Sequence, residues 1–276
     1  MNILYCGDKN IIDGLVISIL SLLKNTTVPL NIYVLTMKYS NKDKTYDRIP
    51  DKYITMLDSL VKKTNKDSFC RLIDITDIVL ECLPTANIDT RFTPYCMLRL
   101  YADQIEDLPS KILYLDNDIV CLKDPTSLYE IDNTKYEIVG VLDYYGKHVF
   151  HKKLYRNDYL NSGVLLLNLD LIRKTKLFLK ARKRCQRVKM LMPDQTAINM
   201  IAKKKFIINR RYNEQHRIKK DTVLRHYTTT FKFWPKVTTQ TIKPWHIDKL
   251  HDILNDHEFD DILEKYQDIM KEINNE

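Results

Sequence analysis

Two carboxylates stand two residues apart directly after an apolar run, in Tyr114-Leu115-Asp116-Asn117-Asp118. Side chains at i and i+2 of an extended segment point to the same side, so Asp116 and Asp118 can face one ligand. Carboxylate oxygens suit Mn²⁺ and Mg²⁺, and open α/β sheets bind ligands at the carboxyl ends of their strands. The triplet alone is a weak signal, because a chain with 27 aspartates contains roughly two or three such triplets by composition. It predicts either a metal site or an ordinary turn or helix cap after a strand.

A histidine and a lysine farther along the chain could complete such a site. His226 follows a strand predicted over 222–224, and Lys232 stands six residues after it. An imidazole suits a metal that two carboxylates already hold, and an ammonium group suits a phosphate. The alternative is a hydrogen-bonded histidine of the core, and the spacing by itself does not decide between the two.

Two further polar segments begin or precede apolar patterns. Asn161-Ser162-Gly163 opens an apolar run, and we expect a turn there whose small residues let the backbone approach a ligand. The alternative is a buried strand after a tight turn without a ligand. Asp194-Gln195 lies at the start of a predicted helix, where Asp194 is either a helix N-terminal acid or a ligand-binding carboxylate.

Glycine is scarce, and its spacing excludes two classes of nucleotide-binding site. The chain has five glycines, from which neither GxGxxG nor GxxxxGK[ST] can be drawn. This argues against a dinucleotide-binding fold of the usual kind and against a P-loop nucleotidase. A diphosphate bound by this chain must therefore be held by a metal or by basic side chains.

The cysteines and the apolar runs indicate a cytoplasmic protein. None of the six cysteines forms a CxxC pair or a zinc-finger spacing with histidine, so we predict buried free thiols of a reducing cytosol. The N-terminus lacks the basic region of a signal peptide, and no apolar run approaches the ~20 residues of a membrane span.

The positive charge is concentrated in one stretch. The chain carries a net charge of +8, whereas residues 171–220 hold 17 Lys or Arg and two acids, a local charge of +15. One interpretation is a solvated helix face with basic loops. The other is peripheral contact with an anionic membrane surface, at about 1 kcal/mol per basic residue. We expect no nucleic acid, because aromatic residues and recognisable reader motifs are lacking there.

The elements that must position these residues alternate between strands and helices. Apolar runs predict strands over 1–7, 31–36, 69–73, 111–115, 137–142, 163–168 and 206–209. Helical spacing predicts helices over 14–24, 51–63, 93–104, 171–189, 194–203 and 247–276. The alternation predicts an α/β fold with a mainly parallel sheet. We expect a catalytic domain over 1–246 and a C-terminal helical extension over 247–276.

Taken together, the motifs resemble a known family. They are Tyr5-Cys6-Gly7-Asp8-Lys9-Asn10, Arg99 within Met97-Leu98-Arg99-Leu100, Asp116-Asn117-Asp118, Asn161-Ser162-Gly163 with the run to Asn168, Asp194-Gln195, and His226-x5-Lys232. In this order and spacing the chain resembles the family 8 glycosyltransferases, a retaining group that includes bacterial lipooligosaccharide galactosyltransferases and glycogenin. The resemblance covers residue 1 to about residue 250. It implies the GT-A fold, a single Rossmann-like α/β/α domain with a mixed, mostly parallel sheet.

The resemblance also implies a UDP-sugar donor, a Mn²⁺ cofactor (or Mg²⁺), and a role for each matching residue. The metal ligands would be Asp116, Asp118 and His226. The uridine contacts would come from Asp8 and Asn10, with Cys6, Gly7 and Asn117 also on the donor. The sugar region would be contacted by Arg99, Asp143, Asn161, Ser162, Gly163 and Asp194, with Gln195 against the anomeric carbon. Gln195 and Asp194 are the candidate catalytic residues, and Lys232 would hold the diphosphate.

The chain departs from the family pattern after His226. The family commonly reads His-x-x-Gly-x-x-Lys-Pro-Trp, but Thr229 stands at the glycine and Phe233 at the proline. A Lys243-Pro244-Trp245 triplet follows eleven residues later. The diphosphate lysine is therefore Lys232 or Lys243, and the distance from His226 favours Lys232.

The resemblance implies transfer of galactose or glucose from UDP-galactose or UDP-glucose to a saccharide or lipid-linked saccharide. Because the Gln195 amide is a poor nucleophile, we hypothesise a front-face route to retention. The competing double displacement would need a carboxylate nucleophile, for which Asp194 is the nearby candidate. Two alternatives remain open from the residues alone. One is a metal-dependent nucleotide-sugar hydrolase or nucleotidyltransferase, and the other is a non-catalytic module that binds anionic surfaces.

Overall fold

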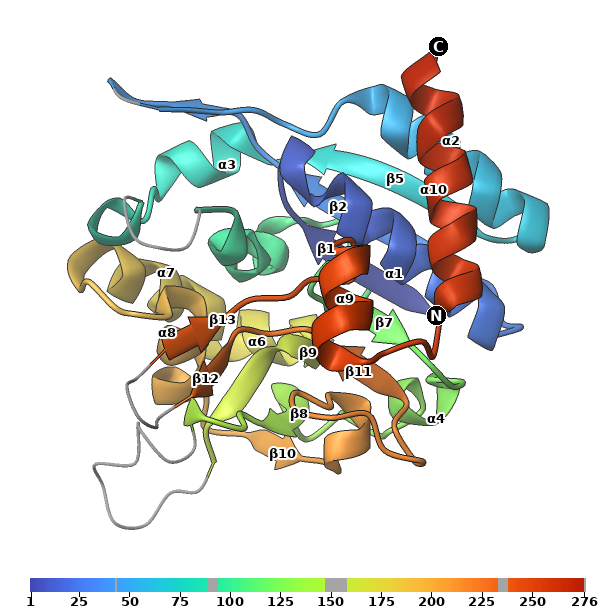
Figure 1. Ribbon diagram of the computed structural model, residues 1–276. Coiled ribbons are helices and arrows are strands. Elements are labelled where there is room, and N and C mark those ends of the chain that lie inside the picture. Colours follow the sequence, from blue (N-terminus) through green and yellow to red (C-terminus); the bar gives the residue numbers. More distant parts are fainter. Residues whose placement is uncertain (43, 89–93, 147–157, 233–237, 276) are drawn as a thin grey trace.

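A seven-stranded sheet forms the centre of the molecule (Figure 1). The computed structural model describes all residues except 43, 89–93, 147–157, 233–237 and 276. The strand order is β10-β8-β9-β6-β1-β2-β5. Their bounds are β1 Asn2–Cys6, β2 Asn31–Thr36, β5 Phe69–Asp74, β6 Lys111–Leu115, β8 Ile138–Leu142, β9 Leu160–Asn168 and β10 Lys205–Ile207. Six of these strands run in one direction, and β9 runs antiparallel to both of its neighbours, β6 and β8.

Helices cover both faces of this sheet and divide the core into two layers. One face is covered by α1 (Ile12–Asn25), α2 (Asp51–Thr64) and α10 (Asp260–Asn275), and the other by the 3₁₀ helix η3 (Pro94–Gln104), α6 (Leu169–Thr175), α7 (Leu177–Arg187) and α8 (Pro193–Ile201). Successive strand residues alternate between the layers: Ile3 and Tyr5 pack on the first, and Leu4 packs on the second. Because both faces are buried, the central strands are continuous apolar runs, which is why the sequence reveals them.

Shorter elements connect these layers. They are the helices η1 (Lys9–Ile11), α3 (Thr76–Glu81), η2 (Thr85–Asn87), α4 (Thr126–Tyr129), η4 (Arg210–Tyr212) and α9 (Ile247–Leu254). Three two-stranded sheets join β7 (Ile119–Cys121) to β11 (Leu224–His226), β12 (Thr230–Lys232) to β13 (Thr238–Gln240), and β3 (Tyr39–Ser40) to β4 (Thr45–Tyr46). The α/β fold with a mixed, mostly parallel sheet is therefore confirmed.

Two helical segments of the sequence analysis are each divided by one left-handed residue. Lys176, at φ 58°, separates α6 from α7, and its N–H donates to the carbonyl of Arg173. Asn255, at φ 48°, ends α9, so the expected helix over 247–276 is two helices. Neither position is marked by glycine, the residue that most often adopts this conformation. The prediction of one continuous helix over 171–189 was wrong.

Three other boundaries differ from the expectation. The turn expected at Asn161-Ser162-Gly163 is the start of β9, whose first residue, Leu160, exchanges two hydrogen bonds of 2.7 Å with the Asn199 side chain. The segment expected as an α-helix from Thr93 is the 3₁₀ helix η3 over its described part, and Thr93 itself lies outside the described residues. The strand expected over 222–224 lies two residues later, at β11.

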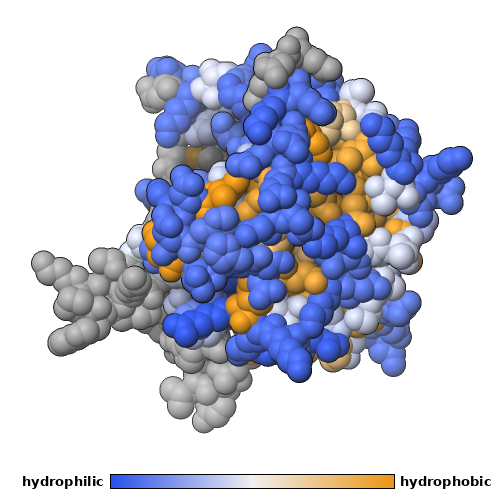
Figure 2. All heavy atoms as spheres, turned by 45° about the vertical axis from the view of Figure 1, so that its right-hand side comes forward, coloured by the Kyte–Doolittle hydropathy of each residue, from blue (hydrophilic) through white to orange (hydrophobic). Residues whose placement is uncertain are grey.

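The C-terminal helix α10 packs on α1. Phe259, Ile262 and Leu263 belong to the same core layer as Leu15, and the Tyr266 hydroxyl donates to Asp13 at 2.7 Å. Figure 2 brings forward the right-hand side of Figure 1, where α10 and α2 lie, and shows mainly hydrophilic side chains with apolar ones between them. The division into 1–246 and 247–276 stays a prediction about folding units.

All six cysteines are free thiols, as predicted. Cys70, Cys121 and Cys185 are buried, whereas Cys6, Cys82 and Cys96 are partly exposed, which corrects the expectation that all are buried. Burial raises the pKa of Cys70 and of Cys185 to about 12. Within the described residues, no helix combines the length and the apolar character that crossing a bilayer requires.

Candidate active site

The sequence-predicted residues meet where β1 and β6 end and β9 begins. Because β9 runs against its neighbours, its first residues lie at the carboxyl edge of the parallel strands. The Asp116 N–H, one residue beyond β6, donates to the Gly163 carbonyl at 2.8 Å. The edge therefore brings together two segments that are more than forty residues apart in the sequence, at the position where open α/β sheets bind ligands.

Asp116, Asp118 and His226 form one cluster. Each offers a ligand atom, and these atoms all lie within 4.8 Å of one another. His226 reaches the cluster because β11 pairs with β7 so that His226 faces Ile119, the residue after Asp118. Its Nε2 lies 3.2 Å from Asp118 Oδ1 and 3.8 Å from Asp116 Oδ2.

This cluster fits a divalent cation. Asp118 Oδ1 is buried and accepts no well-formed hydrogen bond from the part of the chain that the structure describes. A buried carboxylate oxygen without a donor is costly unless a cation or another charge compensates it. The two carboxylates and one imidazole are a ligand set that Mn²⁺ or Mg²⁺ accepts, with carboxylate oxygens in the majority.

Gly163 is the position that lets this cluster close. A Cβ added there would overlap the His226 ring, 2.8 Å from its Nδ1, and would lie 2.9 Å from Asp116 Oδ2. Real Cβ atoms do not come this close to other atoms, so a side chain at this position would displace the histidine or the aspartate. Glycine is therefore required at position 163, because the backbone passes close to the candidate metal-binding side chains of His226 and Asp116.

Arg99 lies buried between the two acidic parts of the site. Its guanidinium donates to Asp116 Oδ1 at 2.9 Å and to the Ser162 carbonyl at 2.6 Å, and its Nε lies 3.3 Å from Asp194 Oδ2. The guanidinium carbon also lies 4.0 Å from the centroid of the Tyr114 ring, whose hydroxyl donates to Asp116. Burial raises the pKa of Asp194, and Arg99 opposes this effect.

A chain of side-chain amides connects the remaining predicted residues. The Gln195 amide donates to Asp143 Oδ2 at 3.1 Å, and Asn161 donates to the same oxygen at 2.9 Å. On its other side, Gln195 Oε1 accepts from the Ser162 N–H at 2.9 Å, and the Ser162 hydroxyl donates to Asp194 at 3.1 Å. These five side chains are each 4–8 % exposed, so the network is held inside the protein.

The N-terminal motif continues β1 beyond the sheet. Cys6 is the last residue of β1, and the Gly7 N–H donates to the Leu35 carbonyl at 3.0 Å. Asp8 caps η1 by accepting from the Asn10 N–H at 3.1 Å and from the Asn10 side chain at 2.8 Å. The local fold of this motif is therefore explained by a helix cap, whatever else Asp8 and Asn10 contact. Asn117 approaches α1 at Gly14, where an added Cβ would overlap the Asn117 carbonyl oxygen.

Of the two lysines considered for the diphosphate, Lys243 lies in the cluster. Its ammonium group is paired with Asp118 Oδ2 and donates to the Tyr227 carbonyl at 3.0 Å. Burial would raise the pKa of Asp118, but Lys243 and His226 outweigh it and hold this pKa well below its usual range. Lys232 ends β12, and its side chain lies outside the described part of the chain, as does Phe233.

Some residues of the site carry no signal in the sequence. Asn213 Oδ1 accepts from His226 Nδ1 at 3.1 Å, and the Asn213 amide nitrogen donates to Asn161 Oδ1 at 2.9 Å, so Asn213 links the metal cluster to the amide chain. Tyr227 donates its N–H to the Asp118 carbonyl at 3.1 Å. No spacing or motif sets either residue apart. The pairing of β7 with β11 brings Tyr227 to the site. Asn213 lies beside it because the next residue, Glu214, bonds to β11 through Leu224 and His226.

Comparison with known proteins gives a consistent result. A profile of the family described as glycosyl transferase family 8 matches residues 2–238. The chain is 28 % identical over 260 residues to a putative glycosyltransferase of Haemophilus influenzae, covering 86 % of this chain and 73 % of that protein. It is 27 % identical over 270 residues to a lipopolysaccharide 1,2-glucosyltransferase of Escherichia coli K12, with the same coverage of 86 % and 73 %. It is 26 % identical over 263 residues to a lipopolysaccharide 1,3-galactosyltransferase of Salmonella typhimurium, covering 89 % and 73 %.

Solved structures share the fold. The galactosyltransferase LgtC, in complex with donor and acceptor sugar analogues, superposes with a TM-score of 0.65 at 18 % identity, over 97 % of this chain and 96 % of that one. An active-site mutant of LgtC superposes with a TM-score of 0.70, also at 18 % identity, over 96 % of both chains. At this level of identity the likeness establishes the GT-A fold.

Proposed function

The chain belongs to glycosyl transferase family 8, and from this premise we propose that it transfers a hexose from a UDP-sugar to a saccharide acceptor with retention of the anomeric configuration. The observation that carries the proposal is the cluster of Asp116, Asp118 and His226, in which a buried carboxylate oxygen of Asp118 accepts no well-formed hydrogen bond from the described residues. This arrangement is expected of a site that binds a cation together with a phosphorylated ligand.

We propose that Asp116, Asp118 and His226 hold Mn²⁺ or Mg²⁺. When bound, such an ion would withdraw negative charge from the diphosphate as the bond to the sugar breaks. Arg99 keeps Asp116 in place and stays charged, and Gly163 lets the imidazole approach the carboxylates. The chain lacks a glycine-rich anion loop, so the remaining charge on the diphosphate must be met by basic side chains.

Lys243 is the basic side chain that we assign to the diphosphate. It already neutralises Asp118 and is 22 % exposed, so its flexible stem can turn toward a phosphate oxygen without crossing the core. A neighbouring residue, Trp245, packs against the start of α1, where an added Cβ on Gly14 would lie close to the indole ring. The packing of Trp245 keeps this lysine beside the cluster. Lys232 remains the alternative.

Donor recognition is assigned to the edge of the sheet around the cluster. Asp8 and Asn10, with Cys6, Gly7 and Asn117, would contact the uridine side. Asp143, Asn161 and Ser162 would contact the sugar, whose hydroxyls need both donors and acceptors. The amide chain supports this role because it fixes the orientation of Gln195 and Asn161 before any ligand arrives.

The geometry favours a front-face route to retention. Asp194, the carboxylate that a double displacement would require, is 5 % exposed and is engaged by Arg99 and Ser162. Gln195 offers only an amide, which is a poor nucleophile but can stabilise positive charge on the sugar carbon through its oxygen. A covalent glycosyl adduct on Asp194 in the unmodified protein would contradict this route.

The relatives narrow the substrate class. Two of them are lipopolysaccharide glucosyl- and galactosyltransferases, so we propose UDP-glucose or UDP-galactose as the donor and a lipid-linked saccharide as the acceptor. Such an acceptor would place the protein at the cytoplasmic face of an anionic membrane. The basic 171–220 stretch supports this contact through the lysines and arginines that it leaves exposed.

A binding experiment tests the proposed donor site. UDP affinity is measured by calorimetry in Mn²⁺ and in EDTA for the wild type, for Asp118→Asn and for the control Asp268→Asn, whose side chain is 75 % exposed on α10. We expect Mn²⁺-dependent binding in the wild type and the control, and at least a tenfold loss in Asp118→Asn. Equal UDP affinity with and without metal would contradict the proposal and favour a non-catalytic module.

A further inference from the structure

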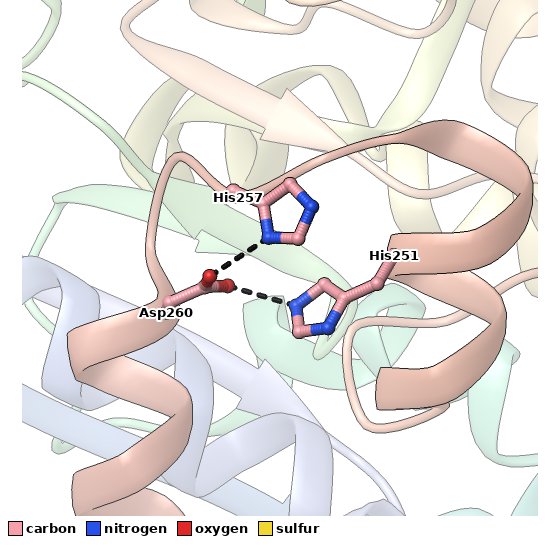
Figure 3. A group of neighbouring side chains, drawn as sticks. All are labelled: His251, His257 and Asp260. Carbon is pink, nitrogen blue, oxygen red and sulfur yellow. Dashed lines mark hydrogen bonds and ion pairs between the residues drawn. The ribbon is translucent and has the colours of Figure 1, made fainter.

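A second cluster of metal-binding side chains lies outside the donor site, at the junction of α9 and α10. His251 belongs to the last turn of α9, His257 lies in the connection that follows, and Asp260 is the first residue of α10 (Figure 3). His251 Nε2 lies 2.8 Å from Asp260 Oδ1, and His257 Nδ1 lies 2.9 Å from Asp260 Oδ2. Figure 3 shows both imidazoles directed at this one carboxylate.

The path of the backbone between α9 and α10 brings the three side chains together. The left-handed Asn255 ends α9 and turns the chain back, so that the two rings stack with centroids 4.3 Å apart. One ligand atom from each residue lies within 4.8 Å of the other two. In a tetrahedral zinc site with bonds of ~2.0–2.2 Å the ligand atoms are separated by about 3.4 Å, so small side-chain rotations suffice.

The chemistry of this cluster differs from that of the donor site. Two imidazoles and one carboxylate are a nitrogen-rich set, which suits Zn²⁺ and similar first-row ions better than Mg²⁺ or Mn²⁺. The side chains are 30 %, 54 % and 40 % exposed, which gives an ion access from solvent and leaves its fourth position to water. The surrounding sequence is acidic, with Asp256, Glu258 and Asp261 beside the ligands, and this favours a cation.

We propose that His251, His257 and Asp260 form a second metal site that binds Zn²⁺ or a related divalent ion and links α9 to α10. The inference does not depend on the proposed function, because these residues lie outside the donor cluster.

Such an ion would act on the segment that supports the active site. The connection between α9 and α10 also contains Asp256, whose carboxylate accepts a hydrogen bond from the buried Tyr227 hydroxyl. Tyr227 follows His226, donates its N–H to the Asp118 carbonyl and accepts from Lys243. Closing the connection between α9 and α10 would therefore restrict the motion of Tyr227 and stabilise the folded chain.

The experiment counts Zn²⁺ bound per chain by equilibrium dialysis in the wild type, His251→Gln, His257→Gln and the control His216→Gln. His216 is an exposed histidine outside both clusters. We expect each cluster variant to bind one Zn²⁺ fewer than the wild type and the control, and we expect Zn²⁺ to raise the Tm of the wild type and the control more than that of either cluster variant.

The same samples are tested for Mn²⁺-dependent UDP binding, which reports the donor site separately. Unchanged UDP binding in His251→Gln and His257→Gln shows that both variants are folded. The proposal is overturned if both variants bind as many Zn²⁺ ions as the wild type, or if His216→Gln loses an ion in the same way.

Discussion

Gly163 and Lys243 show how single residues decide what the site can hold. Gly163 brings the backbone of β9 against His226 and Asp116, and Lys243 places an ammonium group on Asp118. The first was marked by the sequence as a small residue after a polar segment. The second was marked only by a Lys-Pro-Trp triplet in an unexpected place, and spacing from His226 favoured the other lysine.

Gly163→Ala is expected to displace His226 from the carboxylates, because the added methyl group would overlap the imidazole ring. We predict at least a tenfold loss of Mn²⁺-dependent UDP affinity, measured by calorimetry. Gly140→Ala is the matched control: it adds the same methyl group in β8, where the closest atom is 3.1 Å away, in the Leu165 side chain. Equal UDP affinity in Gly163→Ala and the wild type would contradict the proposed cluster.

Lys243→Met is expected to remove the cation that faces the diphosphate while keeping the apolar stem. By analogy with the loss of one transition-state donor, we predict a decrease in kcat/KM of about 100-fold. Lys249→Met, an exposed lysine on α9, serves as the control. If Lys232→Met lowers kcat/KM much more than Lys243→Met does, the diphosphate lysine is Lys232.

The candidate site could be predicted from the sequence where residue type and strand context agree. Asp116, Asp118 and His226 are such residues, and the structure brings them together. Asn213 could not be predicted, because its contact with His226 depends on a bridge between Glu214 and Arg225 that no pattern in the sequence marks. The residues of the network around Gln195 could be predicted individually, but the hydrogen bonds between them could not, because spacing in the sequence does not reveal which side chains bond to one another.

At the scale of elements, the reversed direction of β9 builds the site. A parallel β9 would place Asn161 and Ser162 at the opposite edge of the sheet from Asp116. The apolar pattern predicts a strand here but not its direction, because period and composition are the same in both orientations. The left-handed residues Lys176 and Asn255 could not be located from the sequence either, because neither is glycine, the residue that usually adopts this conformation.

The helix α7 illustrates that part of the basic stretch is structural. Arg182 is 3 % exposed and is paired with Asp103, which is 8 % exposed, and it also donates to the Leu100 carbonyl of η3. Arg182→Met would leave Asp103 buried without a partner, so we predict a decrease of about 3–5 kcal/mol in the free energy of unfolding.

The measurement is urea denaturation followed by circular dichroism, with Lys183→Met as the control. Lys183 is the next residue of α7, but its side chain is exposed. We expect the control to stay within about 0.5 kcal/mol of the wild type. Similar stability for the two variants would show that the Arg182–Asp103 pair contributes little to the fold.

At the scale of the whole molecule, charge is distributed unevenly over an ordinary α/β core. Residues 171–220 carry a net charge of +15, whereas the whole chain carries +8, so the rest of the chain is acidic. Several of these basic residues are engaged within the protein, as Arg182 with Asp103 and Arg210 with Glu214 and Asp221. The alternation of elements predicted the layers correctly, whereas the packing of the C-terminal helix α10 on α1 could not be read from its amphipathic pattern.

The exposed basic residues are expected to bind anionic membranes. We predict that the protein co-sediments with vesicles containing phosphatidylglycerol and that the bound fraction falls steeply as salt rises, since salt screens charges at the surface. Charge reversal of Lys183 and Lys189, both exposed, is expected to weaken sedimentation. Equal sedimentation with neutral and anionic vesicles would exclude this contact.

The most direct test of the account is the identity of the products formed from a panel of UDP-sugars in Mn²⁺ and in EDTA. With no acceptor saccharide present, we predict that water slowly takes its place, so that UDP-galactose or UDP-glucose is converted to UDP and free hexose in Mn²⁺, and that EDTA stops the reaction. Asp118→Asn should be inactive on the same donor. Release of UMP instead of UDP, or release that does not depend on metal, would contradict hexose transfer and favour a nucleotide-cleaving enzyme.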